Sequence, residues 1–284
     1  MDEEVKIIKP QVWNFEVVKG KDAWKEVVYS ARMSGVPEVV KDEAVFSMMV
    51  ENDYGSALEH IIVKFDVKMS KGNAPEFLEH RLASHSGYST RYIEVSEGVD
   101  KKEKAYEVIL PTHLMDDSEI NYLLKKDVEN AIANYKELQE MGASREISRY
   151  VLPFAQAVGT YHVTMNLRSL LNLLSLRLCV RSSPEFRCIA SQIYFNLMES
   201  LPPLKGLVGC RGFNRGACPE NKVTGVRVGK QHPRYPPCPF KSPESDVYIP
   251  TIDELRKGAT LKEFNKEKAL QVREASYKKW SNWE

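Results

Sequence analysis

The most regular pattern in the chain is an alternation of apolar and charged positions between residues 61 and 69. The odd positions are all apolar and the even positions 64, 66 and 68 are charged; the apolar set is Ile61, Val63, Phe65, Val67 and Met69. Successive side chains of a strand point to opposite faces, so this alternation predicts a β-strand with one buried face. A β-rich run at 158–164 and a shorter one at 106–110, closed by Pro111, predict two further strands.

Most of the remaining chain places apolar residues at the three- and four-residue spacing of an amphipathic helix. This spacing predicts helices at 23–33, 42–51, 73–81, 144–150, 167–178 and 185–199. A longer helix is expected to take its cap from residues 116–118, to run to Gln139 and to bury Leu123, Val128, Ile132 and Leu138. The stretch 84–88, which contains serine and glycine, and the segment 95–104 are expected to be loops.

The composition changes after residue 200. Nine of the fifteen prolines lie between Pro202 and Pro250, which predicts a covering loop or linker. A last helix is expected over 261–280 and is predicted to pack against the main body or a partner subunit through Leu261, Phe264, Val272 and Ala275. We therefore divide the chain into a first domain (1–200), a Pro/Cys-rich loop segment (201–250) and a C-terminal helical extension (251–284).

Overall charge excludes some classes of partner. The 284 residues carry 40 Lys and Arg against 39 Asp and Glu, so a net charge of +1 gives no field that would draw the chain onto nucleic acid or an anionic membrane. No apolar run approaches the roughly 18 residues that span a bilayer. The start, Met1-Asp2-Glu3-Glu4, lacks the basic and apolar regions of a signal peptide. We expect a cytoplasmic protein without nucleic-acid or membrane partners.

The five cysteines are too few and too scattered for a secreted disulfide framework, which leaves reduced thiols or a small metal site. Three cysteines and a histidine after residue 200 could supply four zinc ligands: Cys210, Cys218, Cys238 and His232. Their spacing is irregular and contains no Cys-x-x-Cys pair, so we predict no metal. Cys179 and Cys188 are interpreted as small core residues.

Two segments place polar and cationic residues where folding alone does not require them. In the segment from Glu79 to Tyr92, a helix end is followed by hydroxyl groups and Arg91, a combination that can hold phosphate oxygens. In the predicted helix 167–178, Arg168 and Asn172 share a face and could read a heterocycle edge or a pyrophosphate. The alternatives are a solvated helix end with a polar loop and the exposed face of an ordinary helix.

Four spaced elements occur in order along the chain. They are Ser56-Ala57-Leu58-Glu59-His60; His80-Arg81 with Ser89 and Arg91-Tyr92; Arg149-x-Val151-Leu152-Pro153; and Asn166-x-Arg168-Ser169-x-x-Asn172 with Arg177. Together they resemble the flavin-dependent (alternative) thymidylate synthase family over about residues 20 to 220.

The resemblance implies a fold, an activity and a set of partners. The fold would be α+β, with a central, mainly antiparallel sheet flanked by long helices, and residues 1–200 would form the catalytic domain. The enzyme would be a homotetramer whose active sites are built from several subunits. It would carry FAD, take reducing equivalents from NADPH and move a methylene group from methylenetetrahydrofolate, or a related pterin, to C5 of dUMP.

The resemblance also implies roles for individual residues. The matched flavin-binding positions are His60, His80, Arg81, Asn166, Arg168 and Asn172. The matched nucleotide-binding positions are Ser89, Arg91, Arg149 and Arg177. Arg177 would lie at the uracil carbonyl edge and act catalytically, because a guanidinium there stabilises enolate-like charge without a nucleophile from the enzyme. We interpret the Ser89 hydroxyl as a phosphate ligand because no His/Asp pair is evident to activate it.

The sequence departs from the family pattern in the first motif. Glu79 replaces an arginine, Glu76 replaces a glutamine, and Ser86-Gly87 replaces Asn-Glu. A carboxylate is repelled by phosphate but accepts hydrogen bonds from a ribose, so Glu76 is a candidate for substrate binding. One extra residue between Pro153 and Asn166 could shift the strand register. Three interpretations stay open: thymidylate synthase, a divergent enzyme that alkylates C5 of another pyrimidine nucleotide such as UMP, and a non-catalytic nucleotide- or flavin-binding protein.

Overall fold

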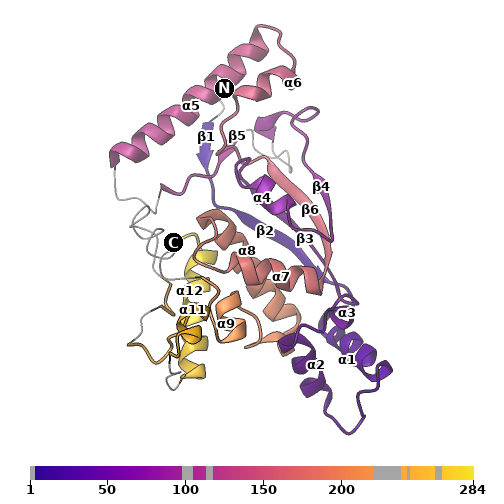
Figure 1. The fold of residues 1–284 in the computed structure, drawn as a ribbon. Helices are drawn as coiled ribbons and strands as arrows, with labels where there is room; N and C mark the ends of the chain where they lie inside the picture. Colours follow the sequence, from indigo (N-terminus) through magenta and orange to yellow (C-terminus); the bar gives the residue numbers. More distant parts are fainter. Residues whose placement is uncertain (1–3, 98–104, 113–117, 221–237, 242–243, 260–263) are drawn as a thin grey trace.

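The computed structural model describes residues 4–97, 105–112, 118–220, 238–241, 244–259 and 264–284 (Figure 1). Its centre is a four-stranded antiparallel sheet in the order β2-β3-β6-β4. The strands are β2 (Gln11–Val17), β3 (Ile62–Met69), β6 (Gly159–Asn166) and β4 (Ala83–Gly87). The sheet, together with the helices described below, confirms the expected α+β architecture.

The alternation along β3 places its apolar side chains in the core. Val63, Phe65 and Val67 are fully buried, as the pattern predicts. All eight residues of β3 pair with β6 in one continuous register, from Ile62 opposite Asn166 to Met69 opposite Gly159. Lys68 departs from the pattern: its side chain is buried, and its Nζ lies 2.6 Å from a carboxylate oxygen of Glu107.

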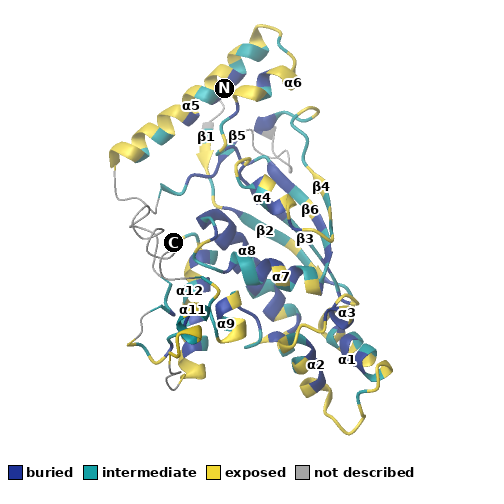
Figure 2. Ribbon diagram, in the orientation of Figure 1, coloured by how far each residue is buried: buried dark blue, intermediate teal, exposed yellow. Residues whose placement is uncertain are grey.

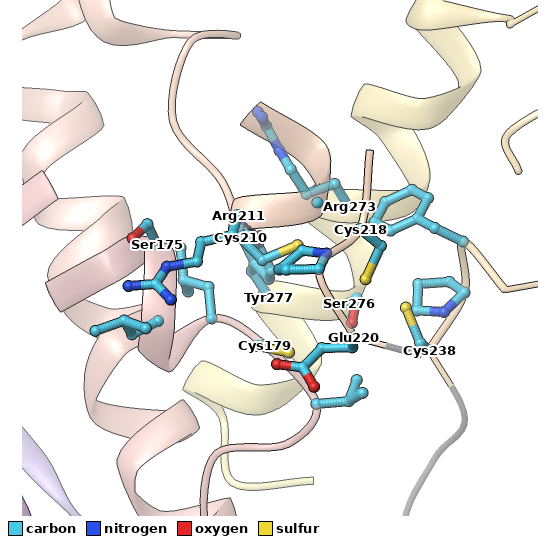
Figure 3. Close-up of a pocket in the computed structure, with 17 residues that line it drawn as sticks. Ser175, Cys179, Cys210, Arg211, Cys218, Glu220, Cys238, Arg273, Ser276 and Tyr277 are labelled. Atoms are coloured by element: carbon cyan, nitrogen blue, oxygen red, sulfur yellow. Dashed lines mark hydrogen bonds between the residues drawn. The ribbon is translucent and has the colours of Figure 1, made fainter. Parts of the chain in front are cut away.

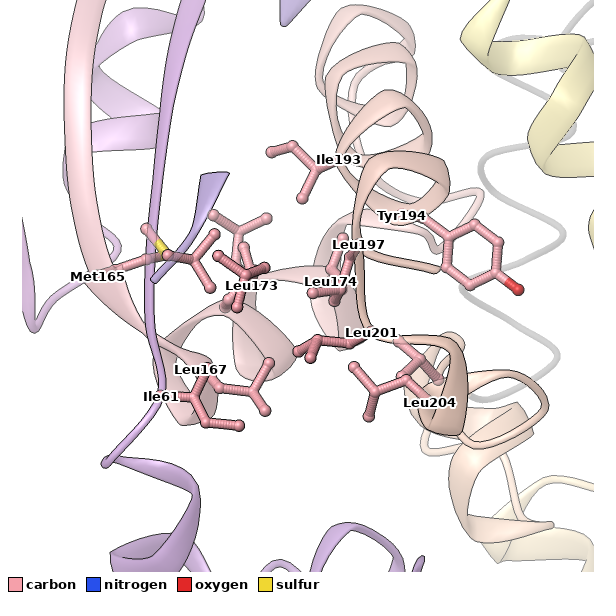
Figure 4. Close-up of a cluster of buried hydrophobic side chains, with 14 of the residues drawn as sticks. Ile61, Met165, Leu167, Leu173, Leu174, Ile193, Tyr194, Leu197, Leu201 and Leu204 are labelled. Carbon is pink, nitrogen blue, oxygen red and sulfur yellow. The ribbon is translucent and has the colours of Figure 1, made fainter. Parts of the chain in front are cut away.

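Two helices cover one face of the sheet and form the main core with it (Figure 4). They are α7 (Leu167–Arg177) and α8 (Pro184–Ser200). Fully buried leucines of α7 meet apolar residues of α8 and the sheet; this set includes Leu167, Leu173, Leu174, Ile193, Leu197 and Met165. Burying each such side chain stabilises the fold by about 1.5–3 kcal/mol, so this seam fixes the orientation of α7.

The chain extends to opposite ends of the molecule (Figure 1). One end holds α1 (Trp24–Met33), α2 (Asp42–Glu51) and α3 (Gly55–Leu58). The other end holds α5 (Ser118–Glu140), α6 (Arg145–Ser148) and a parallel pair formed by β1 (Glu4–Ile7) and β5 (Ala105–Val108). A smaller core joins this second end and includes Tyr106, Val108, Ile132, Tyr135 and Leu152.

Short helical turns complete the described structure. They are η1 (Gly20–Asp22), α4 (Ala74–Leu78), η2 (Val95–Glu97), η4 (Arg149–Val151), η5 (Pro202–Leu204), α9 (Arg211–Arg215) and α11 (Ile252–Arg256). The last helix, α12 (Lys266–Ser281), packs against α8. None of the helices in the described ranges is both long and apolar enough to cross a membrane.

Many residues at the end that carries α5 are exposed (Figure 2), and several of them are large and apolar. Most of the first half of α5 is exposed, including Ile120, Tyr122 and Leu123. Tyr150 and Phe154, which follow α6, are about four-fifths exposed, at 80% and 77%.

Several sequence-based expectations for local structure were wrong. The stretch 84–88, expected to be a loop, belongs largely to the edge strand β4, and Val95 and Ser96, expected at the surface, are buried. Leu123 lies on the exposed side of α5 rather than its buried side. The N-terminal strands β1 and β2 have no counterpart among the predicted elements. Residues 98–104 and the caps expected at 116 and 117 fall outside the described residues.

The inward face of the last helix also differs from the expected one. Its buried residues are Ala269, Arg273, Tyr277 and Trp280, whereas Ala275 and Phe264 are exposed, Val272 is half-buried and Leu261 lies outside the described residues. The cause is two buried arginines that pack against aromatic rings. The Arg187 guanidinium of α8 lies 3.7 Å from the centroid of Trp280, and that of Arg273 lies 4.4 Å from Phe213. Such cation–π contacts let a cation face the interior.

The same alanine-to-glutamate substitution on the buried and on the exposed face of α12 tests which face packs against the protein. Ala269→Glu places an unpaired carboxylate at a fully buried position, and we expect the free energy of unfolding to fall by more than about 3 kcal/mol. The matched variant Ala275→Glu lies on the exposed face and should change it by less than about 0.5 kcal/mol. Urea unfolding of the two variants measures both values; equal losses would show that the helix packs through a different face.

Candidate functional site

A cleft of about 700 Å³ runs along the polar face of α7. Its other walls come from residues 79–82 after α4, from the end of α2, from residues 206–208 and from α9. Five residues predicted from the sequence line it together: His80, Arg81, Arg168, Asn172 and Arg177. The structure therefore gathers two motifs that lie almost ninety residues apart in the sequence into one concave surface.

Helix α7 begins without a connecting loop after strand β6. Asn166 is both the last residue of the strand and the cap of the helix, because its side-chain oxygen accepts a hydrogen bond of 2.8 Å from the Ser169 backbone N–H. The backbone N–H of Leu167 donates to the carbonyl of Ile61, the residue just before β3, at 2.8 Å. The structure thus gives Asn166 a capping role that fixes where the polar face of α7 begins.

Arg168 occupies the cleft beside a glycine that makes room for it. Its guanidinium donates a hydrogen bond of 2.8 Å to Glu59. A Cβ atom added to Gly55 would lie 2.2 Å from the Arg168 guanidinium carbon. Position 55 is therefore restricted to glycine if Arg168 is to keep this orientation.

Arg177, at the end of α7, is held on three sides. Its Nε donates a hydrogen bond of 2.9 Å to Nε2 of His80, and its terminal nitrogen donates to the Glu76 carboxylate. Its guanidinium carbon also lies 4.6 Å from the ring centroid of Phe186. Glu76, predicted to bind substrate, does not line the cleft and reaches the site through Arg177.

His80 is neutral at physiological pH. Burial, the Arg177 charge and His85 lower its pKa to about 4, with burial the largest cause. Because Nε2 accepts the hydrogen bond from Arg177, the proton of the neutral ring lies on Nδ1. The imidazole therefore orients the guanidinium without adding a second positive charge.

The charge of the cleft favours an anion. Six basic side chains line it, while three acidic ones do so: Arg81, Arg168, Arg177, Arg211, Arg215 and Lys266 against Glu51, Asp53 and Glu79. A concave surface with an excess of one charge concentrates ligands of the opposite charge. The composition of this cleft therefore suits phosphate or pyrophosphate groups.

Sequence reasoning missed the wall formed by α9. Arg211 and Arg215 are four residues apart on this short helix and both line the cleft. Their four-residue spacing is typical of two side chains on one face of a helix and could have identified them. The proline-rich composition of the segment favoured a covering loop instead. Glu59, which holds Arg168, lies in the first of the four spaced elements, whereas Phe186, which packs on Arg177, carries no such signal because its contact arises only from the tertiary fold.

Four predicted residues lie away from the cleft: Ser89, Arg91, Arg149 and His60. Ser89 and Arg91 follow β4, whose five residues span about 16 Å, whereas the cleft residues precede that strand. Arg91 lies 3.3 Å from Glu146 of α6, and Arg149 comes just after that helix. Within one chain, the predicted flavin and phosphate residues are therefore separated, and the exposed His60 joins neither group.

Comparisons with known proteins identify the family and the fold. A family model described as thymidylate synthase complementing protein matches residues 16–203. The flavin-dependent thymidylate synthase of Thermosipho africanus is 31% identical over 193 residues, which cover 62% of this chain and 81% of that protein. The enzyme of the same name from Pyrococcus abyssi is 33% identical over 174 residues, which cover 59% of this chain and 69% of that protein.

A solved structure shares the fold. The crystal structure of the UMP/dUMP methylase PolB from Streptomyces cacaoi, bound with 5-Br UMP, superposes with a TM-score of 0.58. The sequences are 22% identical, and the match covers 70% of this chain and 94% of PolB. With two thirds of its length matched by the family model, the chain belongs to the thymidylate synthase complementing proteins and is an enzyme of that flavin-dependent methyltransferase family.

Proposed function

We propose that the chain catalyses the reductive methylation of dUMP to dTMP, with FAD as resident cofactor, NADPH as reductant and methylenetetrahydrofolate, or a related pterin, as carbon donor. The observation that carries this proposal is the cationic cleft in which Arg177 is held between His80 and Glu76. The curated relatives named flavin-dependent thymidylate synthase support it.

The residues of the cleft fit a flavin dinucleotide. Ligand pockets usually enclose about 300–1,000 Å³, and this cleft has about 700 Å³. The excess of basic side chains matches a pyrophosphate, and Arg168 and Asn172 lie side by side on the exposed face of α7. His80, Arg81, Arg168 and Asn172 would hold the cofactor, while Asn166 fixes the helix that carries two of them. When bound, the reduced flavin supplies the hydride for the methylation.

Arg177 is the residue that we assign to charge stabilisation. Addition of a one-carbon unit at C5 makes the uracil ring enolate-like, so negative charge builds up on its carbonyl oxygens. A guanidinium already held by His80, Glu76 and Phe186 needs little reorganisation to meet that charge. Its half-buried position also weakens competition from water.

The nucleotide phosphate would be held by a second copy of the chain. Ser89, Arg91 and Arg149 gather near α6, away from the cleft of their own chain. The exposed Tyr150 and Phe154 lie next to Arg149 in the sequence and offer apolar surface for assembly. We therefore propose a homotetramer in which these residues complete the cleft of a neighbouring subunit.

The acceptor could instead be UMP. Glu79 lines the cleft next to His80 and presents a carboxylate where the family has an arginine. A carboxylate accepts hydrogen bonds from ribose hydroxyl groups, and UMP has a 2′-hydroxyl that dUMP lacks. This observation favours an enzyme that C5-methylates UMP as the second candidate, ahead of a non-catalytic nucleotide- or flavin-binding protein.

An absorbance titration tests the proposal directly. The purified protein is expected to show a flavin band that dUMP perturbs, and to form dTMP when NADPH and methylenetetrahydrofolate are added. A band perturbed only by UMP, with methylation of UMP, would assign the second candidate. A flavin band without methylation of either nucleotide would indicate a non-catalytic binding protein. Failure to bind flavin after reconstitution would contradict both enzyme proposals and flavin binding, and would leave only a protein that binds a nucleotide.

Arg177→Lys keeps the positive charge but loses the planar fork that reaches His80 and Glu76 together. We expect kcat to fall by about 10²–10³, because this is the usual effect of removing one preorganised donor to a developing oxyanion. Steady-state kinetics with saturating substrates measure it. Arg256→Gln serves as a control because Arg256 is exposed and outside the cleft, and its kcat should equal that of the wild type.

Gly55→Ala tests the close approach of Arg168. The added methyl group displaces a flexible guanidinium rather than backbone, so the protein should keep its stability. The dissociation constant for FAD should rise about tenfold, as expected from losing one charge-assisted hydrogen bond. Ser56→Ala, at the exposed neighbouring position, should leave FAD binding unchanged; an equal loss in both variants would exclude a specific role for the glycine.

The low pKa of His80 gives a pH dependence of stability. Between pH 6.5 and pH 4 the unfolded chain binds more protons at this position than the folded chain, so stability rises with pH across this window. When the pH falls from 7 to 5, protonation of His80 should lower the free energy of unfolding by up to roughly 2 kcal/mol. Urea unfolding at both pH values should show a smaller loss in His80→Gln than in the wild type. Equal losses of unfolding free energy in the variant and the wild type would mean that His80 has the same pKa in the folded and the unfolded chain.

A further inference from the structure

Four of the five cysteines face one small cavity beside the cleft (Figure 3). Cys179 follows α7, and Cys210 caps α9. Cys218 lies in a β-bridge to Thr251, and Cys238 precedes the buried Phe240. Their sulfur atoms are free thiols around a cavity of about 70 Å³. The fold thus unites cysteines that are 31, 8 and 20 residues apart in the sequence.

We propose that this cavity binds a four-iron iron–sulfur cluster through Cys179, Cys210, Cys218 and Cys238. Four cysteine sulfurs around one centre are the ligand set of either zinc or an iron–sulfur cluster. The sequence alone directed attention to His232, which lies outside the described residues. In the structure the fourth side chain beside Cys210, Cys218 and Cys238 is Cys179, which we interpreted from the sequence as a core residue.

The spacing of the thiols favours a cluster over a single ion. Zinc binds sulfur at about 2.3 Å, so four thiolates must converge on one point. In the described part of the chain, no three His, Cys, Asp or Glu side chains are arranged to hold a single metal ion. In a four-iron cluster each thiolate binds its own iron, so the sulfurs stay spread around a central volume.

The cavity has room for such a group. About 10–15 Å³ of cavity volume holds one water molecule, and this cavity has about 70 Å³. All four cysteines line this one volume.

The surroundings of the cavity are built to bring the thiols together. At Gly212, an added Cβ atom would lie 3.2 Å from the Cys218 Cβ and 3.4 Å from its sulfur, so the glycine permits the close approach. The Cys210 backbone N–H donates to the buried Tyr277 hydroxyl at 3.2 Å. Arg211, Arg273 and Glu220 also line the cavity, which gives its lining one more basic than acidic side chain.

The cluster would fasten the last third of the chain to the first domain. Its ligands come from the end of α7, from α9 and from segments packed on α12, so it would link all three. Ser175, Leu176 and Arg211 line both this cavity and the cleft. The proposed cluster therefore supports one wall of the cleft, and it stands independently of which nucleotide that cleft binds.

Metal analysis of the full-length chain tests the proposal. The protein is produced with iron and zinc both supplied, purified without oxygen, and analysed for iron, acid-labile sulfide and zinc. We expect about four iron atoms and about four sulfides per chain, with a Mössbauer spectrum of a cubane cluster that flavin cannot mimic. One zinc per chain with no sulfide would overturn the proposal, as would failure to take up iron and sulfide during anaerobic reconstitution.

Matched cysteine variants locate the ligands. Cys179→Ser and Cys218→Ser should each lower the iron content at least about fivefold. Cys188→Ala is the control, because Cys188 is buried beside Gln192 and does not line the cavity, and it should keep its iron. Circular dichroism checks that each variant has folded. Wild-type iron content in folded Cys179→Ser and Cys218→Ser, or loss from Cys188→Ala alone, would contradict the assignment.

Discussion

The direct junction between β6 and α7 is the constraint on which the rest of the structure depends. Asn166 ends the strand and caps the helix, and Leu167 donates a backbone hydrogen bond to Ile61, just before β3. The rotation of α7 about its axis is therefore set by the sheet. Its leucines enter the core, which leaves Arg168, Asn172 and Arg177 on the wall of the cleft. A single junction thus couples the hydrophobic core to the chemistry of the site.

The contacts of Arg177 explain how the substitutions Glu76 and Glu79 in the first motif affect the site. Glu76 does not face the cleft; its carboxylate holds Arg177 from behind, while neutral His80 accepts from the same guanidinium. An acid in place of the usual amide gives the arginine a charged partner. Glu79 is different because it lines the cleft and faces any ligand there. One replacement therefore positions a cation, and the other alters the surface of the cleft.

The sequence predicted the parts of this structure in which local pattern and tertiary role agree. The alternation of β3 and the leucine stripe of α7 belong to this class, and the polar residues of α7 follow from the stripe. Strand β4 was missed because its Ser/Gly composition is typical of loops, and it becomes a strand only through pairing with β6. The inward face of α12 was missed because Arg273 reads as a surface residue until aromatic rings surround it. The meeting of four cysteines depends on long-range packing, which spacing along the chain does not encode.

The β6–α7 junction also determines where the chain tolerates changes of length during evolution. One residue inserted after Asn166 would rotate α7 by about 100°, which would turn leucines towards water and arginines towards the core. An extra residue ahead of β6, where residues 154–158 hydrogen-bond to residues 71–72 and 107–109, does not rotate α7, and the β3–β6 register is continuous. Length variation among relatives should therefore accumulate ahead of the strand and be absent where the strand becomes a helix.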